Sequence, residues 1–197
     1  MKIAIYGATG NIGPRLVAEA LRRGHEVTAI GRTERAIAQG ATFVTGDAAD
    51  PAFVERIAGS HDVVVSALNT NETFLDSIRA LIAHAGTTRL IVVGGAGSLL
   101  TSAGTRLVDA PEFPAGWKAG ALLQTQALDL LLAADPDVDW TYLSPAPEIS
   151  AGERTGKYLT ALDEPAGEHI SYEDYAVALL DEIESPQHGR QRFTVAN

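Results

Sequence analysis

The sequence alternates short apolar runs with longer amphipathic stretches, and this alternation constrains the fold more than any other feature. Runs rich in β-branched residues predict strands, and most of them are apolar at nearly every position. Parallel strands covered by helices on both faces have this composition, whereas strands with one solvated face alternate apolar and polar residues. The predicted strands are residues 2–6, 26–30, 41–45, 62–67, 89–93, 140–143 and 192–195.

Helical patterns fill the intervals between these strands. The first of them places Ile12 and Leu16 on one stripe and ends at Gly24, a residue typical of helix C-termini. Asp50, followed by a proline, is a suitable N-cap for the second. Strands joined by helices of this length predict an α/β fold: a Rossmann-type doubly wound, mostly parallel sheet with helices on both faces, in a single domain over residues 1–197. The predicted helices are residues 11–23, 50–58, 71–84, 116–134 and 172–184.

Charge and composition exclude several classes of function. A net charge of −10 and a pI near 4.9 argue against nucleic acid as a partner, because binding to phosphates needs a basic surface. The chain has no cysteine, and its histidines have no spacing that suggests a metal site or a catalytic triad. No apolar stretch resembles a signal peptide or approaches the roughly 18 residues of a membrane span. We therefore expect a cytoplasmic protein, a monomer or homodimer, without a membrane partner or a metal.

Two segments, residues 98–115 and 150–169, do not follow the alternation. Each comes after the carboxyl end of a late predicted strand, and ligands of open α/β sheets bind at those ends. Long loops inside a compact domain are more often functional than decorative. We expect both segments to wall a substrate pocket; the alternative is that they are ordinary surface loops.

The stretch GATGNIG follows the first predicted strand directly and opens the first predicted helix. Gly7 permits a sharp turn out of the strand, Gly10 lets the backbone approach a pyrophosphate, and Gly13 lets the helix lie close to the sheet. The free N–H groups and positive dipole end of the helix then face the phosphates. We expect a dinucleotide site, with further contacts from Thr9, Asn11 and Ile12. The alternative is a plain turn between a strand and a helix.

The end of the second predicted strand indicates which dinucleotide is bound. A cofactor with a free ribose 2′-hydroxyl favours an acidic residue about 20 residues after the glycines. Here Gly31 holds that position and Arg32 follows, with Thr33 and Arg35 nearby. A small residue and a guanidinium suit a 2′-phosphate, which accepts paired, charge-assisted hydrogen bonds. We therefore expect NADP(H) to be preferred over NAD(H); the alternative is that Arg32 is only a solvated surface charge.

These motifs carry a family resemblance. GATGNIG, GDAAD after the third strand, VVVSALN after the fourth and VVGGAGS after the fifth resemble the short-chain dehydrogenase/reductase superfamily. The later pieces WTYLSPAPEI, GERTGKY and ISYEDYAVALLDEIE narrow the resemblance to its atypical branch of NAD(P)H-flavin reductases and biliverdin-IXβ-reductase-like proteins. The resemblance runs along nearly the whole chain and is more specific for fold and cofactor than for substrate.

The resemblance implies cofactor contacts beyond the glycine loop. The implied contacts are Asp47 and Ala48 at the adenine, Ser66, Ala67 and Leu68 beside the nicotinamide ribose, Gly94 and Gly95 beneath the nicotinamide, and Ser144, Pro145 and Ala146 over its amide. The alternative for Asp47 is that it caps a short helix, a common role for aspartate.

The chain departs from the superfamily at the catalytic Tyr-x-x-x-Lys pair. Lys118 stands at a plausible lysine position, but the residue four before it is Pro114. The family's catalytic serine position is taken by glycine, with Ser98 a few residues farther on. We nominate Ser98 as proton donor and Lys118 as ribose clamp; a solvated Lys118 is the alternative. Without the tyrosine, interconversion of alcohols and ketones is unsupported.

Reduction of a conjugated ring does not need that tyrosine, because the protein mainly binds, orients and excludes water. We expect an NADPH-dependent oxidoreductase that transfers hydride to a flavin, quinone or tetrapyrrole-like acceptor. One alternative is a non-catalytic NADP(H)-binding redox sensor; another is an epimerase or reductase of a small carbonyl compound. We expect the acceptor pocket to be lined by Leu99, Leu100, Phe113, Trp117 and Tyr158. The alternative for Phe113 and Trp117 is that they anchor their loop to the core.

Overall fold

The computed structural model describes all 197 residues and confirms the predicted α/β class. Strands and helices alternate through most of the chain, with two short 3-10 helices before α4. The elements are β1 (Lys2–Tyr6), α1 (Gly13–Arg22), β2 (Glu26–Gly31), β3 (Thr42–Thr45), α2 (Pro51–Ala58), β4 (Val63–Ser66), α3 (Phe74–His84), β5 (Arg89–Val93), η1 (Ala96–Ser98), η2 (Leu107–Asp109), α4 (Ala115–Leu132), β6 (Trp140–Pro145), β7 (Glu148–Ser150), β8 (Leu159–Ala161), β9 (His169–Ser171), α5 (Tyr172–Glu184) and β10 (Gln191–Ala196).

One eight-stranded sheet forms the centre of the molecule, in the order β3-β2-β1-β4-β5-β6-β10-β8. Seven of these strands run parallel, and the short edge strand β8 pairs antiparallel with β10. The order reverses between β1 and β4, and doubly wound sheets bind ligands beyond the carboxyl ends of the strands at this reversal. The position of a site is thereby set before any side chain is considered.

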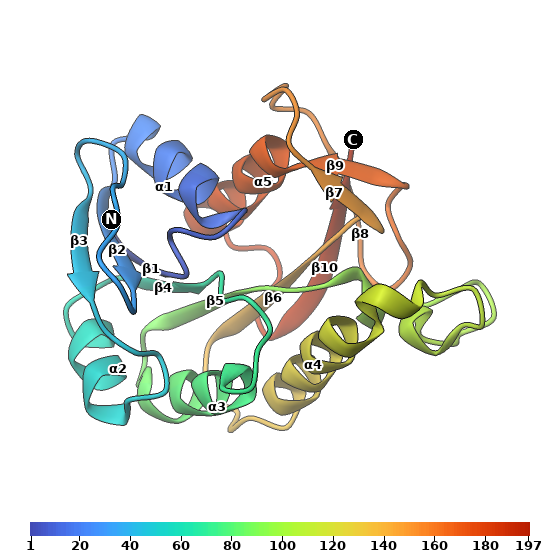
Figure 1. The fold of residues 1–197 in the computed structure, drawn as a ribbon, viewed down its shortest axis with the longest axis horizontal. Coiled ribbons are helices and arrows are strands. Elements are labelled where there is room, and N and C mark those ends of the chain that lie inside the picture. The colour runs from blue at the N-terminus through green and yellow to red at the C-terminus, as the bar shows by residue number, and fades with distance from the viewer.

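Helices cover both faces of the sheet, as Figure 1 shows: α1 and α5 lie on one face, and α2, α3 and α4 lie on the other. Alternate residues of a strand therefore enter different cores. In β1, Ile3 and Ile5 belong to the core under α1 and α5, whereas Ala4 and Tyr6 belong to the core under α2 and α3. Burial on both faces explains why the parallel strands read as continuous apolar runs.

Local sequence sets several helix ends, among them those expected at Asp50 and Gly24. The Asp50 carboxylate accepts the N–H groups of Ala52 and Phe53 at the start of α2. Ser171 caps α5 by accepting the N–H of Asp174, and Gly24 has a φ of +81° after α1, a conformation that favours glycine. None of the helices combines the length and apolar character needed to cross a membrane.

The segment 150–169 is the main difference from the expected arrangement. It holds β8, and it is flanked by β7 and β9, which form a small parallel sheet of their own. The segment binds to α5 rather than to the ligand edge: Glu173 accepts the N–H of Gly152, and Asp174 accepts the N–H of Gly156. Carboxylates in the first turn of α5 thus hold the loop, which the chain pattern alone did not indicate.

A buried carboxylate joins α1 to two other parts of the chain. Glu19 is 4% exposed and accepts hydrogen bonds from Arg22, Arg23 and Arg154. Arg23 also pairs with Asp181 of α5. Burial by itself raises the pKa of a carboxyl group, but the three guanidinium groups outweigh that effect and hold the pKa of Glu19 well below its usual range.

Replacing this carboxylate should cost stability in a pH-dependent way. We expect Glu19→Gln to lower the free energy of unfolding near pH 7 by about 1–3 kcal/mol, because the three guanidinium groups lose the negative charge and one of the two oxygens that accept their hydrogen bonds. Since the folded-state pKa is depressed, the contribution of Glu19 is present above its unfolded pKa of about 4.3 and is lost as the pH falls below it. The difference between wild type and variant should therefore shrink on acidification, as measured by urea unfolding from pH 7 down to about pH 3.

Asp76→Asn is the matched control, because Asp76 pairs with Arg79 on the exposed surface of α3. An exposed pair contributes about 0–1 kcal/mol. An equal loss in both variants, or a loss in Glu19→Gln that does not change with pH, would contradict the assignment.

Candidate functional site

The candidate site lies along the carboxyl edge of the parallel sheet. The connections that follow β1, β2, β3, β4, β5 and β6 all reach this edge, and two cavities open between them. Leu68 and Asn69, after β4, line both cavities, so the two are adjacent parts of one crevice. The crevice lies at the reversal of strand order, as expected for this fold.

Two glycines of the loop after β1 are required by the protein's own backbone. Gly7 has a φ of +75°, and a Cβ there would lie 2.2 Å from the carbonyl oxygen of Ala67. A Cβ on Gly13 would lie 2.2 Å from the carbonyl oxygen of Gly7. The loop is therefore packed against the end of β4 on one side and against the start of α1 on the other.

Gly10 differs from these two glycines, because nothing in the chain requires it. The nearest atom to a Cβ at this position would be the Gly7 carbonyl oxygen at 3.4 Å, an ordinary contact. Gly10 lines the first cavity, so that Cβ would occupy cavity space. The residue keeps open a place where a ligand can approach the backbone.

Unpaired backbone donors surround the opening left by Gly10. The N–H groups of Thr9, Asn11 and Ile12 form no hydrogen bond within the chain, and the start of α1 adds its positive dipole end. Such a group of N–H donors suits an anion, above all a phosphate. The loop therefore fits the pyrophosphate of a dinucleotide.

The first cavity has a volume of about 310 Å³ and extends from the glycine loop to the ends of β2 and β3. It is lined by many of the residues expected at the pyrophosphate and adenosine part of the cofactor, and by Leu68, which was expected beside the nicotinamide ribose. They are Gly7, Thr9, Gly10, Arg32, Thr33, Arg35, Asp47, Ala48 and Leu68.

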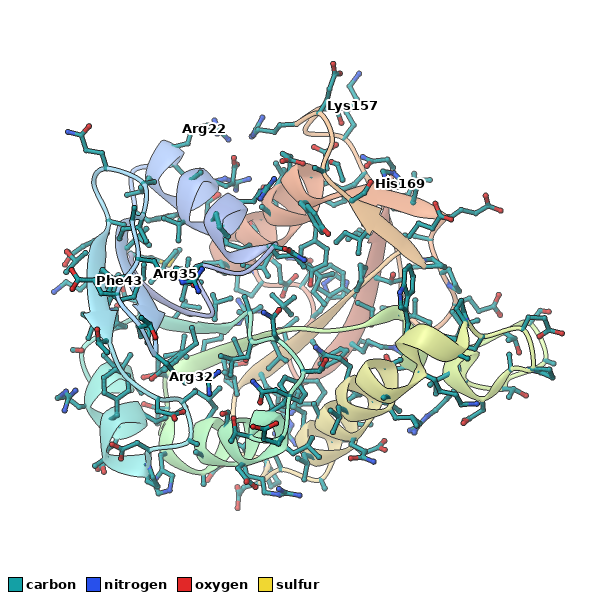
Figure 2. All side chains as sticks on the ribbon, viewed as in Figure 1. Arg22, Arg32, Arg35, Phe43, Lys157 and His169 are labelled. Atoms are coloured by element: carbon teal, nitrogen blue, oxygen red, sulfur yellow. The ribbon has the colours of Figure 1, made fainter.

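Arg32 and Arg35 are exposed and line this cavity without a partner. Every other arginine of the chain contacts a carboxylate, a carbonyl oxygen or an aromatic ring. Figure 2 shows both side chains leaving the segment after β2 on the side of the crevice, whereas Arg22 lies on the outer surface of α1. Two unpaired guanidinium groups in a chain of net charge −10 mark this cavity as a place for an anion.

Asp47 and Tyr6 complete the first cavity. One carboxylate oxygen of Asp47 accepts the N–H of Ala49, so the residue shapes a turn, while the cap of α2 is Asp50. Tyr6 was not among the expected residues. Its hydroxyl is buried without a hydrogen-bond partner in the chain, and burial raises its pKa.

The second cavity is larger, about 940 Å³, and it is bounded by the ends of β5 and β6, by α4 and by the segment after η1. This volume lies in the upper range for ligand sites. Trp117 is 64% exposed, so it does not anchor its loop to the core. The expected residues that line the cavity are Asn11, Ile12, Ala67, Leu68, Gly94, Gly95, Pro145, Ala146, Phe113 and Trp117.

The Gly94–Gly95 segment forms a side-chain-free part of this cavity wall and is tightly held. A Cβ on Gly94 would lie 2.1 Å from the ring of Tyr142, which is fully buried. The Tyr142 hydroxyl accepts the N–H of Gly95 at 3.1 Å, and the hydroxyls of Ser98 and Ser144 both donate to the Gly95 carbonyl oxygen at 3.2 Å. Burial raises the pKa of Tyr142, so it stays a neutral hydroxyl. The cluster fixes the backbone on which a flat ring could lie.

Several expected residues lie away from both cavities. Ser98 is 1% exposed with its hydroxyl on Gly95, so it positions that segment and is not placed to donate a proton to a ligand. Tyr158 donates to Asp181 of α5 at 2.6 Å and lines neither cavity. Lys118 is exposed on α4 and is not a lining residue. Others are enclosed in the protein or outside the lining: Gly13, Ser66, Leu99, Leu100 and Ser144.

The two irregular segments contribute unequally to the cavity walls. The segment 98–115 supplies several lining residues, among them Leu107, Phe113 and Pro114. The segment 150–169 supplies none, because it is bound to α5. Only β7, just before it, reaches the second cavity.

Sequence reasoning missed most of the polar lining of the second cavity. Asn69 directly follows the expected Leu68 at the carboxyl end of β4, which was a usable indication. The others are Thr70, Thr101, Glu112, Gln124, Glu148 and Tyr172. Thr70 follows Asn69, and Thr101 and Glu112 lie in the segment 98–115 that was expected to wall the pocket, whereas the other three come from α4, β7 and α5, whose approach only the fold reveals. No cluster of side chains suitable for a metal ion occurs in the structure.

Comparisons with known proteins agree with this geometry. Residues 7–186 match the NAD(P)H-binding family. The chain is 40% identical over 212 residues to YwnB of Bacillus subtilis, a protein of uncharacterised function, and the match covers 100% of this chain and 99% of YwnB.

Solved structures give the same result for the fold. A Burkholderia pseudomallei protein provisionally named an exported protein is 41% identical, with a TM-score of 0.90 and full coverage of both chains. A Streptococcus pneumoniae protein provisionally named an NADH-flavin reductase is 35% identical, with a TM-score of 0.91, over 100% of this chain and 99% of the other. The anaerobilin reductase ChuY of Escherichia coli O157:H7 shares the fold, with a TM-score of 0.80. It is 20% identical, and the match covers 100% of this chain and 97% of ChuY.

The glycines of the loop give a test that separates ligand binding from folding. We expect Gly10→Ala to leave the melting temperature nearly unchanged, because its Cβ meets only ordinary contacts, but to weaken binding of a nicotinamide dinucleotide about tenfold or more. Gly13→Ala should instead lower the melting temperature by about 5 °C or more, because its Cβ meets backbone. Thermal melts and titration with NADPH and NADH check both.

Gly189→Ala serves as control, since a Cβ there meets nothing within 4 Å. Unchanged dinucleotide affinity in Gly10→Ala would refute this placement of the ligand.

Proposed function

The chain belongs to the NAD(P)H-binding family, and from that premise we propose that it is an NADPH-dependent oxidoreductase that transfers hydride to a conjugated acceptor such as a flavin or a quinone. The observation that carries the proposal is the side-chain-free Gly94–Gly95 wall, which faces a cavity of about 940 Å³ beside the glycine loop. The Streptococcus pneumoniae relative is provisionally named an NADH-flavin reductase, and the match covers nearly the whole of both chains. This similarity supports the same class of reaction.

The residues present fit a nicotinamide dinucleotide along the full crevice. Gly10 and the free N–H groups of Thr9, Asn11 and Ile12 would hold the pyrophosphate. Gly94 and Gly95 would lie against the nicotinamide ring, which supplies the hydride when the cofactor is bound. The protein's part is then to place an acceptor ring against that face and to exclude water.

The preference for NADPH rests on the end of β2. Gly31 leaves no carboxylate for a ribose 2′-hydroxyl, and it lines the first cavity together with Arg32 and Arg35. Both guanidinium groups lack a partner within the chain, so both are free to form hydrogen bonds with a phosphate.

The two residues nominated as proton donor and ribose clamp lie outside the second cavity, so they give no support to reduction of a simple ketone there. Lys118 does not line the cavity, and the Ser98 hydroxyl donates its hydrogen bond to the Gly95 carbonyl oxygen. A simple carbonyl needs a proton donor at its oxygen as hydride arrives. A conjugated ring spreads the incoming charge over several atoms, so water can supply the proton that completes its reduction.

Turnover is tested directly by following the near-UV absorbance of NADPH in the presence of riboflavin or a naphthoquinone. We expect oxidation well above the rate without protein, and we expect Gly94→Ala to reduce it strongly because its Cβ displaces the ring of Tyr142. Tight NADPH binding without turnover of any acceptor would point to a redox sensor and refute the reductase.

Substitution of the unpaired arginines tests the choice of cofactor. We expect Arg32→Ala and Arg35→Ala each to weaken NADPH binding about ten- to hundredfold, since a charge-assisted hydrogen bond contributes about 1.5–3 kcal/mol, and to change NADH binding little. Arg79→Ala, which removes an exposed arginine of α3, is the control. Tighter binding of NADH than NADPH by the wild type would overturn the preference.

A further inference from the structure

The two cavities differ in the charged side chains that line them: Arg32, Arg35 and Asp47 line the first, whereas only carboxylates line the second. We infer that the acceptor is an uncharged or cationic planar ring, and that anionic acceptors are disfavoured. This inference rests on the proposed reductase function and narrows it. It distinguishes among acceptors that the hydride chemistry alone would treat alike: riboflavin from its phosphate ester, a quinone from its sulfonate, and either from a tetrapyrrole that carries propionates.

The first cavity is the cationic end of the crevice. Arg32 and Arg35 line it, both unpaired, and the N–H groups of the glycine loop lie between it and the second cavity. The groups suited to the phosphates of a dinucleotide are therefore at this end and at its boundary with the second cavity, which Asn11 and Ile12 line.

The second cavity has the opposite character. Of its 28 lining residues the only charged ones are Glu112 and Glu148, and no lysine, arginine or histidine is among them. Glu112 comes from the segment before α4 and Glu148 from β7. An anion placed there would meet two carboxylates and no cation.

Cations on the surrounding elements do not change this balance, because each is paired with a carboxylate or lies outside the lining. Arg15 of α1 pairs with Glu173, Arg106 of the segment before η2 pairs with Asp129, Arg192 of β10 pairs with Asp163, and Lys118 of α4 is exposed outside the lining.

The rest of the lining suits a flat apolar ring. Phe113 and Trp117 are aromatic, and Pro114, Pro147 and Leu107 add apolar surface around the side-chain-free Gly94–Gly95 segment. Aromatic side chains favour stacked or edge contacts with a planar ligand. Trp117, at 64% exposure, presents most of its ring to solvent and could be covered by such a ligand. Shape thus selects a ring, and charge selects which substituents the ring can carry.

The size of the charge effect is limited by exposure. Glu112 and Glu148 are both exposed, so their repulsion of an anion is screened by water and by salt. Like charges set against each other reduce affinity and the rate of encounter, and both effects weaken as ionic strength rises. We therefore expect about a tenfold preference at low salt that declines as salt is added.

Two matched pairs of acceptors test the inference: riboflavin with FMN, which share one ring and differ by a phosphate, and naphthoquinone with its sulfonate. KM is measured for each from NADPH oxidation. Dissociation constants for the flavins are measured separately from quenching of their fluorescence by protein saturated with NADP⁺, a readout that needs no turnover. The expected result is a KM and a dissociation constant about tenfold lower for the uncharged member at low salt, with the ratio approaching one near 1 M salt.

Removal of the two carboxylates should reduce this preference. The Glu112→Gln/Glu148→Gln variant should bring the FMN to riboflavin ratio close to one at low salt. Glu164→Gln, which removes an exposed carboxylate outside both cavities, should leave the ratio as in the wild type.

The inference and the proposed function fail in different ways. If the anionic member of each pair is used as well as the uncharged one at low salt, the charge selection is wrong while the reductase stands. If no acceptor is turned over, the reductase is wrong, and the fluorescence titration alone decides: tighter binding of riboflavin than FMN supports the selection, and equal binding or binding of neither overturns it.

Discussion

The close approach of the chain after β1 to the chain after β4 is the constraint on which the site depends. Gly7 leaves the strand with a positive φ and lies where a side chain would strike the Ala67 carbonyl. These two strands are the neighbours at which the sheet order reverses, so their connections diverge and the crevice opens between them. The start of α1 is brought to that opening by the same turn, and its free N–H groups face any ligand there.

The fold could be predicted closely because its signals are local or periodic. Continuous apolar runs follow from burial on both faces, and Asp50 and Ser171 mark helix starts through hydrogen bonds to residues two or three positions on. The three-residue strands β7 and β9 carry too little periodicity to be recognised. Their pairing depends on contacts between distant parts of the chain.

Many of the residues that line the first cavity could be predicted for the same reason as the fold, since they follow the strands directly. The lining of the second cavity could be predicted only in part, through the ends of β5 and β6 and the segment 98–115. Ser98 lies in the expected segment, but its hydroxyl faces inward. There it donates a hydrogen bond to Gly95 and lies close to Ser144 of β6. Tyr158 is held away by Asp181, a partner 23 residues further along the chain. Side-chain direction in irregular segments is set by partners that spacing does not reveal.

The packing of Gly94 against Tyr142 makes these two positions interdependent over evolutionary time. A side chain larger than hydrogen at 94 has space only after the ring at 142 has become smaller. A smaller residue at 142 removes the hydroxyl that accepts the Gly95 N–H, so the wall of the cavity loses its support before any new side chain can benefit from the space. A descendant that acquires a different chemistry has an easier route through the segment 98–115 and α4, whose lining residues can change without passing through that unfavourable intermediate.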